Sequence, residues 1–340
     1  EGGAHIVHPL EIATQLIKNG HEVQLFIPKV EKLAQTINVP YEMIPAPRWF
    51  KGSSFIFFEL LLPFYLMKHI RKTKYSNKKV ILYARHRELG LTSILIKEMF
   101  NIPFVDEYND IVWETLSSFA ENAMYSRFEK FIKTNALLKA MILGLEKLMF
   151  RHASAVIAVT PELKKYIMDT AKVPEEKVTV VPNGCNIEAV TVLDKQKCRK
   201  ELGLDAHLTY LCHIGSLNPW QGIDDVLDSL ALLVKERPNT KLLLVGEGPY
   251  RETLEKKVIE LGMKDHVIFT GHVQHDKITL YIGASDVCMF LKKLTSYGLS
   301  SLKLYEYLAA GRPIIGRDIP SIQFIKEQDI GALLPLTASA

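Results

Sequence analysis

Several common signatures are absent from this chain of 340 residues. Its four cysteines, Cys185, Cys198, Cys212 and Cys288, include no C-x-x-C pair, and no histidine stands near them at zinc-ligand spacing. A structural zinc site and a disulfide framework are therefore not expected, which suits a reducing cytosol. No signal peptide opens the sequence, and its longest apolar stretch, residues 55–67, is too short to span a bilayer.

A strong charge excess is also missing. Lys and Arg total 42 and Asp and Glu total 38, and this excess is too small to predict nucleic-acid binding. The excess is concentrated in residues 1–182, which carry a net charge of +5, whereas residues 183–340 carry −1. The apolar fraction of 48% and the charged fraction of 24% are close to globular averages and exclude a disordered or fibrous chain.

Apolar strands and amphipathic helices alternate along the chain, which predicts an α/β fold with parallel sheets. Residues 1–182 contain a predicted helix at 6–18 and predicted strands at 21–27, 80–83, 104–107, 155–159 and 178–181. The polar segment 183–207 is interpreted as a linker. Residues 208–340 contain predicted strands at 209–214, 242–245, 267–269, 287–291 and 313–315 and predicted helices at 223–236, 251–261, 278–282 and 301–310. We expect two Rossmann-like, doubly wound domains that face a cleft, where ligands bind in such folds.

Glycine-containing turns adjoin several of these elements. Gly2 and Gly3 stand directly before the first helix, where they either let the backbone approach a phosphate or form an ordinary loop. Asn183 and Gly184 follow the last strand of the first domain, where they form a tight turn or point into the cleft. Gly246 follows a later strand and is equally compatible with a nucleotide-facing turn and with a plain strand–helix turn.

The segment 300–313 is the most informative part of the sequence. Ser300 and Ser301 begin a predicted helix with Lys303 in its first turn and Glu306 one turn later, so Lys303 and Glu306 share one helix face. A lysine at a helix N-terminus opposes the helix dipole, and its presence is explained if an anion docks there. Glu306 would then accept hydrogen bonds from two adjacent hydroxyls, as a ribose offers. The alternative is an N-cap followed by a surface Lys–Glu pair.

Polar side chains gather where the predicted strand 104–107 ends. Asp106, Glu107, Asn109 and Asp110 lie at its C-terminal end, where active-site groups collect in α/β sheets. Such carboxylates either orient sugar hydroxyls and handle a proton, or form a polar loop that caps the next helix.

The segment 55–79 is apolar in its first half and basic in its second half. Its cations have no acidic residue between them and are Lys68, Arg71, Lys72, Lys74, Lys78 and Lys79. An amphipathic, lysine-rich helix can lie on an anionic membrane, and the alternative is a packed helix with a solvated basic end.

Taken together, these stretches resemble the glycosyltransferases of the GT-B fold, specifically glycosyltransferase family four. The motifs that carry the resemblance are residues 2–4 with 16–23, residues 155–160 with 181–184, and residues 243–249, 267–273 and 303–313. The first two are similar to that family's acceptor domain and the last three to its donor domain. They stand in the family's order over nearly the whole chain.

The resemblance implies transfer of a sugar from a nucleotide-sugar donor to a saccharide or lipid-linked acceptor, with retention. We expect no cofactor and no metal, because the donor domain has no Asp-x-Asp motif and Lys303 with the helix amides can supply the positive charge. Glu306 would bind the donor ribose, Lys303 the diphosphate, and Gly271 with Val273 the base through backbone groups. The donor-binding residues expected on this basis are Gly2, Gly3, Asn183, Gly184, Gly215, Ser216, Gly246, Gly271, Val273, Ser300, Ser301, Leu302, Lys303 and Glu306. The residues expected to take part in catalysis are Lys303, Glu107, Asn109 and Asp110.

The chain also departs from the family's pattern. Gly298 stands where a glutamate is common, Asn109 stands where a histidine is common, and Ser216 and Gln221 fall near the places of an arginine and a lysine. Two phosphate-binding cations are thus absent, so Lys303 must carry more of the charge. The family's usual first strand and final helix are missing, and we expect the chain to be truncated at both ends.

Two other functions stay open at this point. A nucleotide-sugar epimerase of GT-B-like fold would use Asp106, Glu107 and Asp110 to activate a water molecule. A catalytically inactive sugar-nucleotide-binding protein would tolerate Gly298, Ser216 and Gln221. For the transferase we expect a role in polysaccharide biosynthesis, a cytoplasmic location and peripheral contact with the inner face of the cell membrane.

Overall fold

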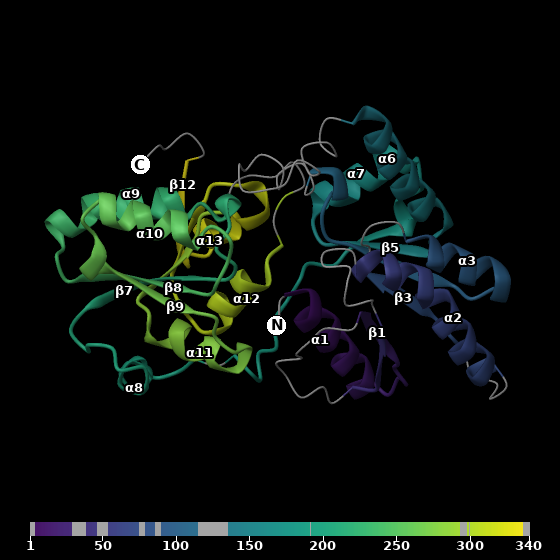
Figure 1. The fold of residues 1–340 in the computed structure, drawn as a ribbon, viewed down its shortest axis with the longest axis horizontal. Coiled ribbons are helices and arrows are strands. Elements are labelled where there is room, and N and C mark those ends of the chain that lie inside the picture. The colour runs from purple at the N-terminus through teal and green to yellow at the C-terminus, as the bar shows by residue number, and fades with distance from the viewer. Residues whose placement is uncertain are drawn as a thin grey trace. The chain divides into compact units, whose positions relative to one another are not determined.

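The computed structural model describes residues 4–28, 39–45, 54–74, 79–85, 90–114, 135–190, 192–292, 298 and 300–335. The chain forms two compact units, unit 1 over residues 1–182 and unit 2 over residues 183–340 (Figure 1). Gly2 and Gly3, which we expected to face the donor phosphates, lie outside the described residues.

Unit 1 is built of parallel strands with helices between them. Strands β1 (Leu25–Pro28) and β2 (Tyr41–Ile44) pair with each other. A second sheet has the order β3-β4-β5-β6 and contains β3 (Leu82–Arg85), β4 (Phe104–Tyr108), β5 (Ala155–Ala158) and β6 (Val178–Val180). The helices are α1 (Ala4–Lys18), α2 (Ser54–Lys74), α3 (Leu91–Phe100), α6 (Ala136–His152) and α7 (Pro161–Ala171).

Local chemistry explains where the helices of unit 1 begin and what they cover. The side chain of Asn135 caps α6 by accepting from the backbone N–H of Leu138, and the Thr160 hydroxyl caps α7 in the same way. Helices α2 and α3 bury Leu66, Ile70 and Ile96 in a shared apolar cluster. Each of these helices therefore has one face committed to the core of unit 1.

Unit 2 contains one parallel sheet of order β12-β11-β10-β7-β8-β9. Its strands are β7 (Thr209–Ile214), β8 (Thr240–Val245), β9 (Val267–Gly271), β10 (Val287–Phe290), β11 (Ile314–Arg317) and β12 (Gly331–Leu334). Its helices are α8 (Lys195–Glu201), α9 (Ile223–Glu236), α10 (Arg251–Glu260), α11 (His275–Ala284), α12 (Leu302–Ala309) and α13 (Phe324–Glu327).

The strand order of unit 2 reverses at β7. The chain proceeds from β7 to β8 and β9 on one side, and β10, β11 and β12 extend the sheet on the other side. Helices α9 and α10 cover one face of the sheet, and α11 and α12 cover the opposite face (Figure 1). In open α/β sheets such a reversal leaves a crevice at the C-terminal ends of the flanking strands, and ligands bind there.

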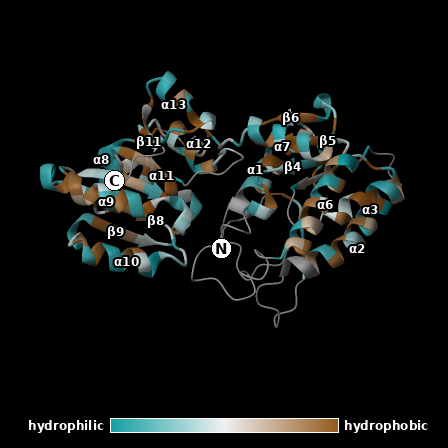
Figure 2. Ribbon diagram, turned by 90° about the horizontal axis from the view of Figure 1, so that it is seen from above, coloured by the Kyte–Doolittle hydropathy of each residue, from teal (hydrophilic) through white to brown (hydrophobic). Residues whose placement is uncertain are grey.

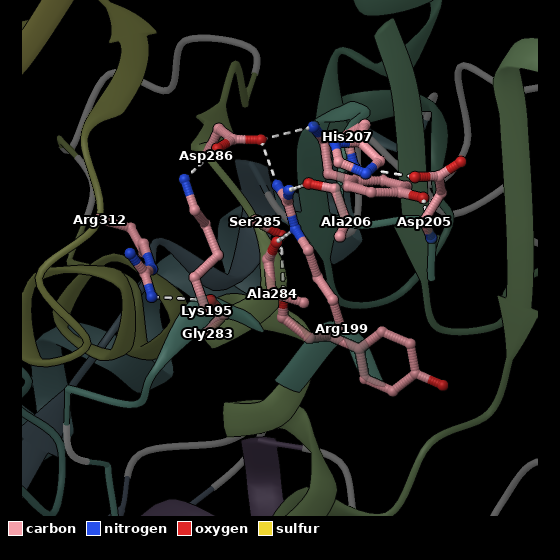
Figure 3. A network of polar contacts seen from close by, with 12 residues as sticks. Lys195, Arg199, Asp205, Ala206, His207, Gly283, Ala284, Ser285, Asp286 and Arg312 are labelled. Atoms are coloured by element: carbon pink, nitrogen blue, oxygen red, sulfur yellow. Dashed lines mark hydrogen bonds and ion pairs between the residues drawn. The ribbon is translucent and has the colours of Figure 1, made fainter. Parts of the chain in front are cut away.

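The structure differs from the linker that we predicted at residues 183–207. This segment belongs to unit 2 and contains α8, whose Arg199 is buried. The Arg199 guanidinium donates to the carbonyl of Ala284 at 2.9 Å and to Asp286 at 2.6 Å, and Lys195 binds the same carboxylate at 2.7 Å (Figure 3). Because a buried guanidinium requires such partners, these bonds tie α8 to the start of β10.

Candidate functional sites

The first site lies at the C-terminal edge of the sheet of unit 2, where the turns after β7 and β8 pack directly on each other. Gly215 and Gly246 both have left-handed backbone angles, with φ of +125° and +138°. A Cβ atom on Gly246 would lie 2.2 Å from the carbonyl oxygen of Gly215, so no side chain fits. The backbone N–H of Gly215 donates to Val245, and that of Leu217 donates to Glu247. The result is a close-packed backbone surface at the predicted ligand edge.

Lys303 is the cation of this site. It lies in the first turn of α12, and its Nζ donates to the Gln221 side-chain carbonyl at 2.9 Å. A Cβ on Gly215 would come within 3.1 Å of the same nitrogen, so the glycine makes room for the lysine. Burial lowers the pKa of Lys303 to about 7, and Lys292 adds to the effect against the opposing charge of Glu306. Lys303 is therefore not the solvent-exposed partner in a surface pair.

Glu306 lies one turn along α12 from Lys303 and is only 7% exposed. Its carboxylate is 3.5 Å from the imidazole of His275 at the start of α11. Burial raises the pKa of Glu306, and the charges of His275 and Lys303 oppose this rise. Glu306 is buried and Lys303 is half-buried, so the alternative of a fully exposed surface Lys–Glu pair does not describe them.

A second buried base adjoins Lys303. His213, in β7, is 1% exposed, and burial together with the charge of Lys303 holds its pKa well below the ordinary value. The imidazole is thus neutral near pH 7 and adds no positive charge to the site. Sequence reasoning missed His213, because a histidine in an apolar strand is usually a core residue.

The turn that opens unit 2 is tied to the N-terminal end of α12. The backbone N–H of Asn183 donates to the Ser300 hydroxyl at 2.8 Å, and its side-chain amide donates to the Ser300 carbonyl at 2.6 Å. Ser301 is the N-cap position and Leu302 the first helical residue, but Ser301 makes no side-chain cap bond. Gly184 lies in the same turn, and a Cβ atom added there would meet no other atom within 4 Å. The structure therefore brings these predicted donor-binding residues together.

The remaining predicted donor residues lie on neighbouring loops. Gly271 ends β9 with a φ of +75° and bridges to Gly246. Val273 lines an open depression of about 450 Å³ on the loop between β9 and α11. The Ser216 hydroxyl accepts from the Asn218 side chain at 2.6 Å. Arg251, which pairs with Glu247, stacks over the Phe269 ring beside this loop.

The second site lies in unit 1 around Glu107, at the C-terminal end of β4. Glu107 is 2% exposed and accepts from His8 at 2.7 Å, from Asn109 at 2.6 Å and from the Tyr83 hydroxyl. Burial alone would raise the pKa of Glu107, but these hydrogen bonds outweigh it and lower the pKa. The carboxylate stays ionised and is a weak base. Its geometry suits positioning of His8, Tyr83 and Asn109 better than proton transfer.

Three further carboxylates of unit 1 lie in or near the same sheet. Asp106 is fully buried, and Asp110 is half-buried just after β4. Glu146, in α6, is also fully buried and accepts from the Tyr108 hydroxyl at 2.5 Å, from the Tyr166 hydroxyl at 2.9 Å and from a backbone N–H. Sequence reasoning missed Glu146 and His8. The sequence did contain a signal for Glu146, because it is the single acidic residue within the mostly apolar helix 136–152.

The described residues contain neither a metal-binding cluster nor a membrane-spanning helix. No group of three His, Cys, Asp or Glu side chains among them is arranged to hold a metal ion. No helix in the described part of the chain combines the length and apolar character that crossing a bilayer requires.

Comparison with known families gives two matches that together cover most of the chain. Residues 6–189 match the family profile described as Glycosyltransferase Family 4. Residues 194–336 match the profile described as Glycosyl transferases group 1. The first match alone covers more than half of the chain and includes the Glu107 site, and the second includes Lys303 and Glu306.

Individual proteins are similar at lower coverage. The alpha-monoglucosyldiacylglycerol synthase of Streptococcus pneumoniae is 25% identical over 251 residues, which are 72% of this chain and 53% of the synthase. The chain spans about half the length of the first curated relatives that it matches.

Solved structures support the fold. The sucrose-phosphate synthase of Thermosynechococcus elongatus superposes with a TM-score of 0.75 at 19% identity, over 99% of this chain and 82% of the synthase. Anabaena HepE in complex with UDP-glucose superposes with a TM-score of 0.67 at 16% identity, over 95% of this chain and 79% of HepE. At these identities the likeness concerns the fold, and it confirms the predicted α/β architecture of two parallel-sheet domains.

Proposed function

The chain belongs to glycosyltransferase family 4, and from this premise we propose that it transfers a sugar from a nucleotide-sugar donor to an acceptor with retention. The observation that carries the proposal is the cluster of Lys303, Gln221, Gly215 and Glu306 where the sheet order of unit 2 reverses. At this edge the Lys303 cation and the glycine backbone fit a diphosphate, and the buried Glu306 carboxylate fits the hydroxyls of an adjoining ribose.

The proposed mechanism centres on the leaving group. Breaking the sugar–phosphate bond increases negative charge on the nucleoside diphosphate, and Lys303 is placed to stabilise it as an ammonium ion. The partly buried position strengthens this interaction, because water screens it less than at the surface. The backbone N–H groups at the start of α12 add to the positive potential. Glu306 would hold the ribose hydroxyls, with His275 positioned behind its carboxylate.

Unit 1 has the acceptor-binding role in this proposal. Asn109 and Asp110 would orient acceptor hydroxyls at the C-terminal end of β4. The sequence alone pointed to Glu107 as a catalytic group. Its bonded oxygens and lowered pKa support a positioning role instead, in which it fixes the orientation of Asn109 and His8.

The proposed classes of donor and acceptor come from two of the similar proteins. HepE is described in complex with UDP-glucose, and the S. pneumoniae relative is named for a monoglucosyldiacylglycerol. We therefore propose a UDP-sugar as donor and a lipid-linked or saccharide acceptor, with a role in polysaccharide or glycolipid assembly. Gly298 lies at a position where the family commonly has glutamate, so the donor sugar is best identified by screening.

The proposed place of action is the cytoplasmic face of an anionic membrane. Lys68, Arg71 and Lys72 are exposed on α2. Each cation near an anionic leaflet contributes about 1 kcal/mol, enough together for reversible binding. Flotation with anionic but not with neutral vesicles supports this location, and no flotation with either excludes it.

The decisive experiment measures nucleoside diphosphate release from a panel of nucleotide sugars with mixed glycolipid and saccharide acceptors. Lys303→Ala is expected to lower turnover by about 10²–10³ with a smaller change in donor affinity. Lys235→Ala, at an exposed lysine of α9, is the matched control and should leave turnover unchanged. Conversion of the donor to another nucleotide sugar without acceptor would indicate an epimerase. Donor binding with no turnover on any acceptor would indicate an inactive binding protein.

A further inference from the structure

Three neighbouring helices of unit 1 expose large apolar side chains in regular stripes. The stripe residues, here called the apolar face, are Leu60 and Phe64 of α2, Leu91, Leu95 and Met99 of α3, and Leu137, Met141 and Leu148 of α6. Their exposed fractions run from 39% to 81%, although each helix buries a different side in the core. Single exposed apolar residues are ordinary, whereas a set of this kind on adjacent helices marks an interaction surface.

The three helices that carry the stripes are neighbours in unit 1. Helix α2 contacts α3, and α3 contacts α6. Figure 2 shows the three helices side by side in unit 1, each with hydrophobic segments. On every helix the exposed apolar residues recur at intervals that return to the same side, for example Leu91, Leu95 and Met99 on α3. Opposite sides are committed to the core through Leu66, Ile70 and Ile96.

The charges that continue this surface are positive. On α2 the exposed stripe runs from Leu60 and Phe64 directly into Lys68, Arg71 and Lys72. The acidic residues on the three helices are few. Among the described residues of these helices, Glu146 is buried, Glu59 is half-buried, and Glu98 is exposed but lies 3.3 Å from His152.

We infer that the apolar face docks on a lipid bilayer of anionic composition, with its leucine, methionine and phenylalanine side chains inserted and the α2 cations on the headgroups. Aliphatic side chains without polar groups fit hydrocarbon, and lysine and arginine at one end of the stripe fit lipid phosphates. A second copy of the chain fits less well, because it would oppose these cations with almost no carboxylates. The inference extends the proposed membrane association from electrostatic contact to insertion by three helices, and it does not depend on the transfer activity.

The test compares vesicle flotation of paired variants in which apolar residues become glutamine. The pairs are Leu60→Gln with Phe64→Gln, Leu95→Gln with Met99→Gln, and Leu137→Gln with Met141→Gln. Leu232→Gln with Ile259→Gln in unit 2 is the matched control, since these two residues are similarly exposed, at 56% and 55%. Unchanged thermal unfolding and circular dichroism show that each variant is folded, as expected for exposed positions.

We expect each pair in unit 1 to lower partition onto anionic vesicles by about tenfold or more, and the control to leave partition unchanged. Binding of the parent protein should survive high salt in part, because apolar insertion is not screened. If only substitution of Lys68, Arg71 and Lys72 abolishes flotation, the insertion is refuted while electrostatic association stands. If the apolar pairs change the oligomeric state and not flotation, the face is a protein–protein interface and the inference is wrong. No flotation of the parent protein overturns both proposals, and the donor assay then still decides the transfer activity independently.

Discussion

Donor binding should take up a proton, because Lys303 is held partly neutral in the free protein. Burial and Lys292 lower its pKa from 10.5 to about 7. This lowering corresponds to a penalty of about 5 kcal/mol on the ammonium form, at about 1.4 kcal/mol for each pKa unit. A diphosphate beside the nitrogen opposes that penalty and raises the pKa again. Below pH 7 the ammonium ion is already present, and above pH 7 each binding event must add the missing proton.

The consequence is a donor affinity that falls as the pH rises. Linkage predicts a loss of about tenfold between pH 6 and pH 8, with almost one proton bound per donor at the upper end. Both phosphates of a nucleotide sugar are esterified, so the donor itself does not titrate in this range. Two further neighbours of Lys303 do not titrate in this range, because burial holds the pKa of His213 well below its ordinary value and raises that of Cys212 to about 12.

The assay is calorimetric titration with UDP-glucose in buffers of different ionisation enthalpy, repeated across the pH range. Lys303→Met should abolish the proton uptake and flatten the pH profile. His275→Asn removes the other imidazole, beside Glu306, and should keep the uptake. A donor affinity that is constant between pH 6 and pH 8, or an identical slope in Lys303→Met, would refute the assignment of Lys303 to the diphosphate.

Three further outcomes are expected. Glu306→Ala should weaken UDP-glucose binding by about 1.5–3 kcal/mol in calorimetry without lowering the unfolding temperature, and unchanged affinity would exclude the ribose contact. Gly222→Ala should lower the urea-derived free energy of unfolding by more than about 2 kcal/mol, because φ is +72° and a Cβ would lie 2.0 Å from the Leu291 carbonyl oxygen. Gly262→Ala, with a φ of +68° but open space, should cost less, and equal losses would mean that the contact is irrelevant. Turnover should persist in a chelator, because Lys303 and the start of α12 supply the positive charge, and its restoration by magnesium would contradict this.

Local patterns predicted the elements of unit 2 well where strands are short and apolar and helices are amphipathic. Strand β7 and helix α9 begin and end at the residues expected from periodicity. Helix α8 was missed because its anchor is distant in sequence, since Arg199 binds Asp286 across 87 positions. Strands β2 and β12 were also missed, because each has only four residues and no flanking signal that distinguishes it from a loop. Periodicity detects the faces of an element, but not a partner many residues away.

The same limit applies to the site. The spacing of Lys303 and Glu306 predicted one shared helix face, but not that Glu306 is buried and Lys303 half-buried. The surroundings of Lys303 come from distant parts of the sequence, since its bond to Gln221 spans 82 positions and its charge acts on His213. Similarly, Glu107 was expected to be reactive from its place after a strand. Its bonds to His8 and Tyr83 span 99 and 24 positions and could not be inferred from a local motif.

Gln221 shows most clearly what the fold adds. By sequence it marks the loss of a cation, because the family commonly has a lysine near this place. In the structure its side-chain carbonyl accepts a hydrogen bond from Lys303 at 2.9 Å. A lysine at position 221 could not accept this bond and would place a second ammonium group beside Lys303. Two adjacent cations in a partly buried site repel each other and would lower the pKa of Lys303 further. Glutamine at position 221 therefore gives Lys303 a hydrogen bond that orients its ammonium group, where a lysine would add a second positive charge. This arrangement is consistent with Lys303 alone binding the diphosphate.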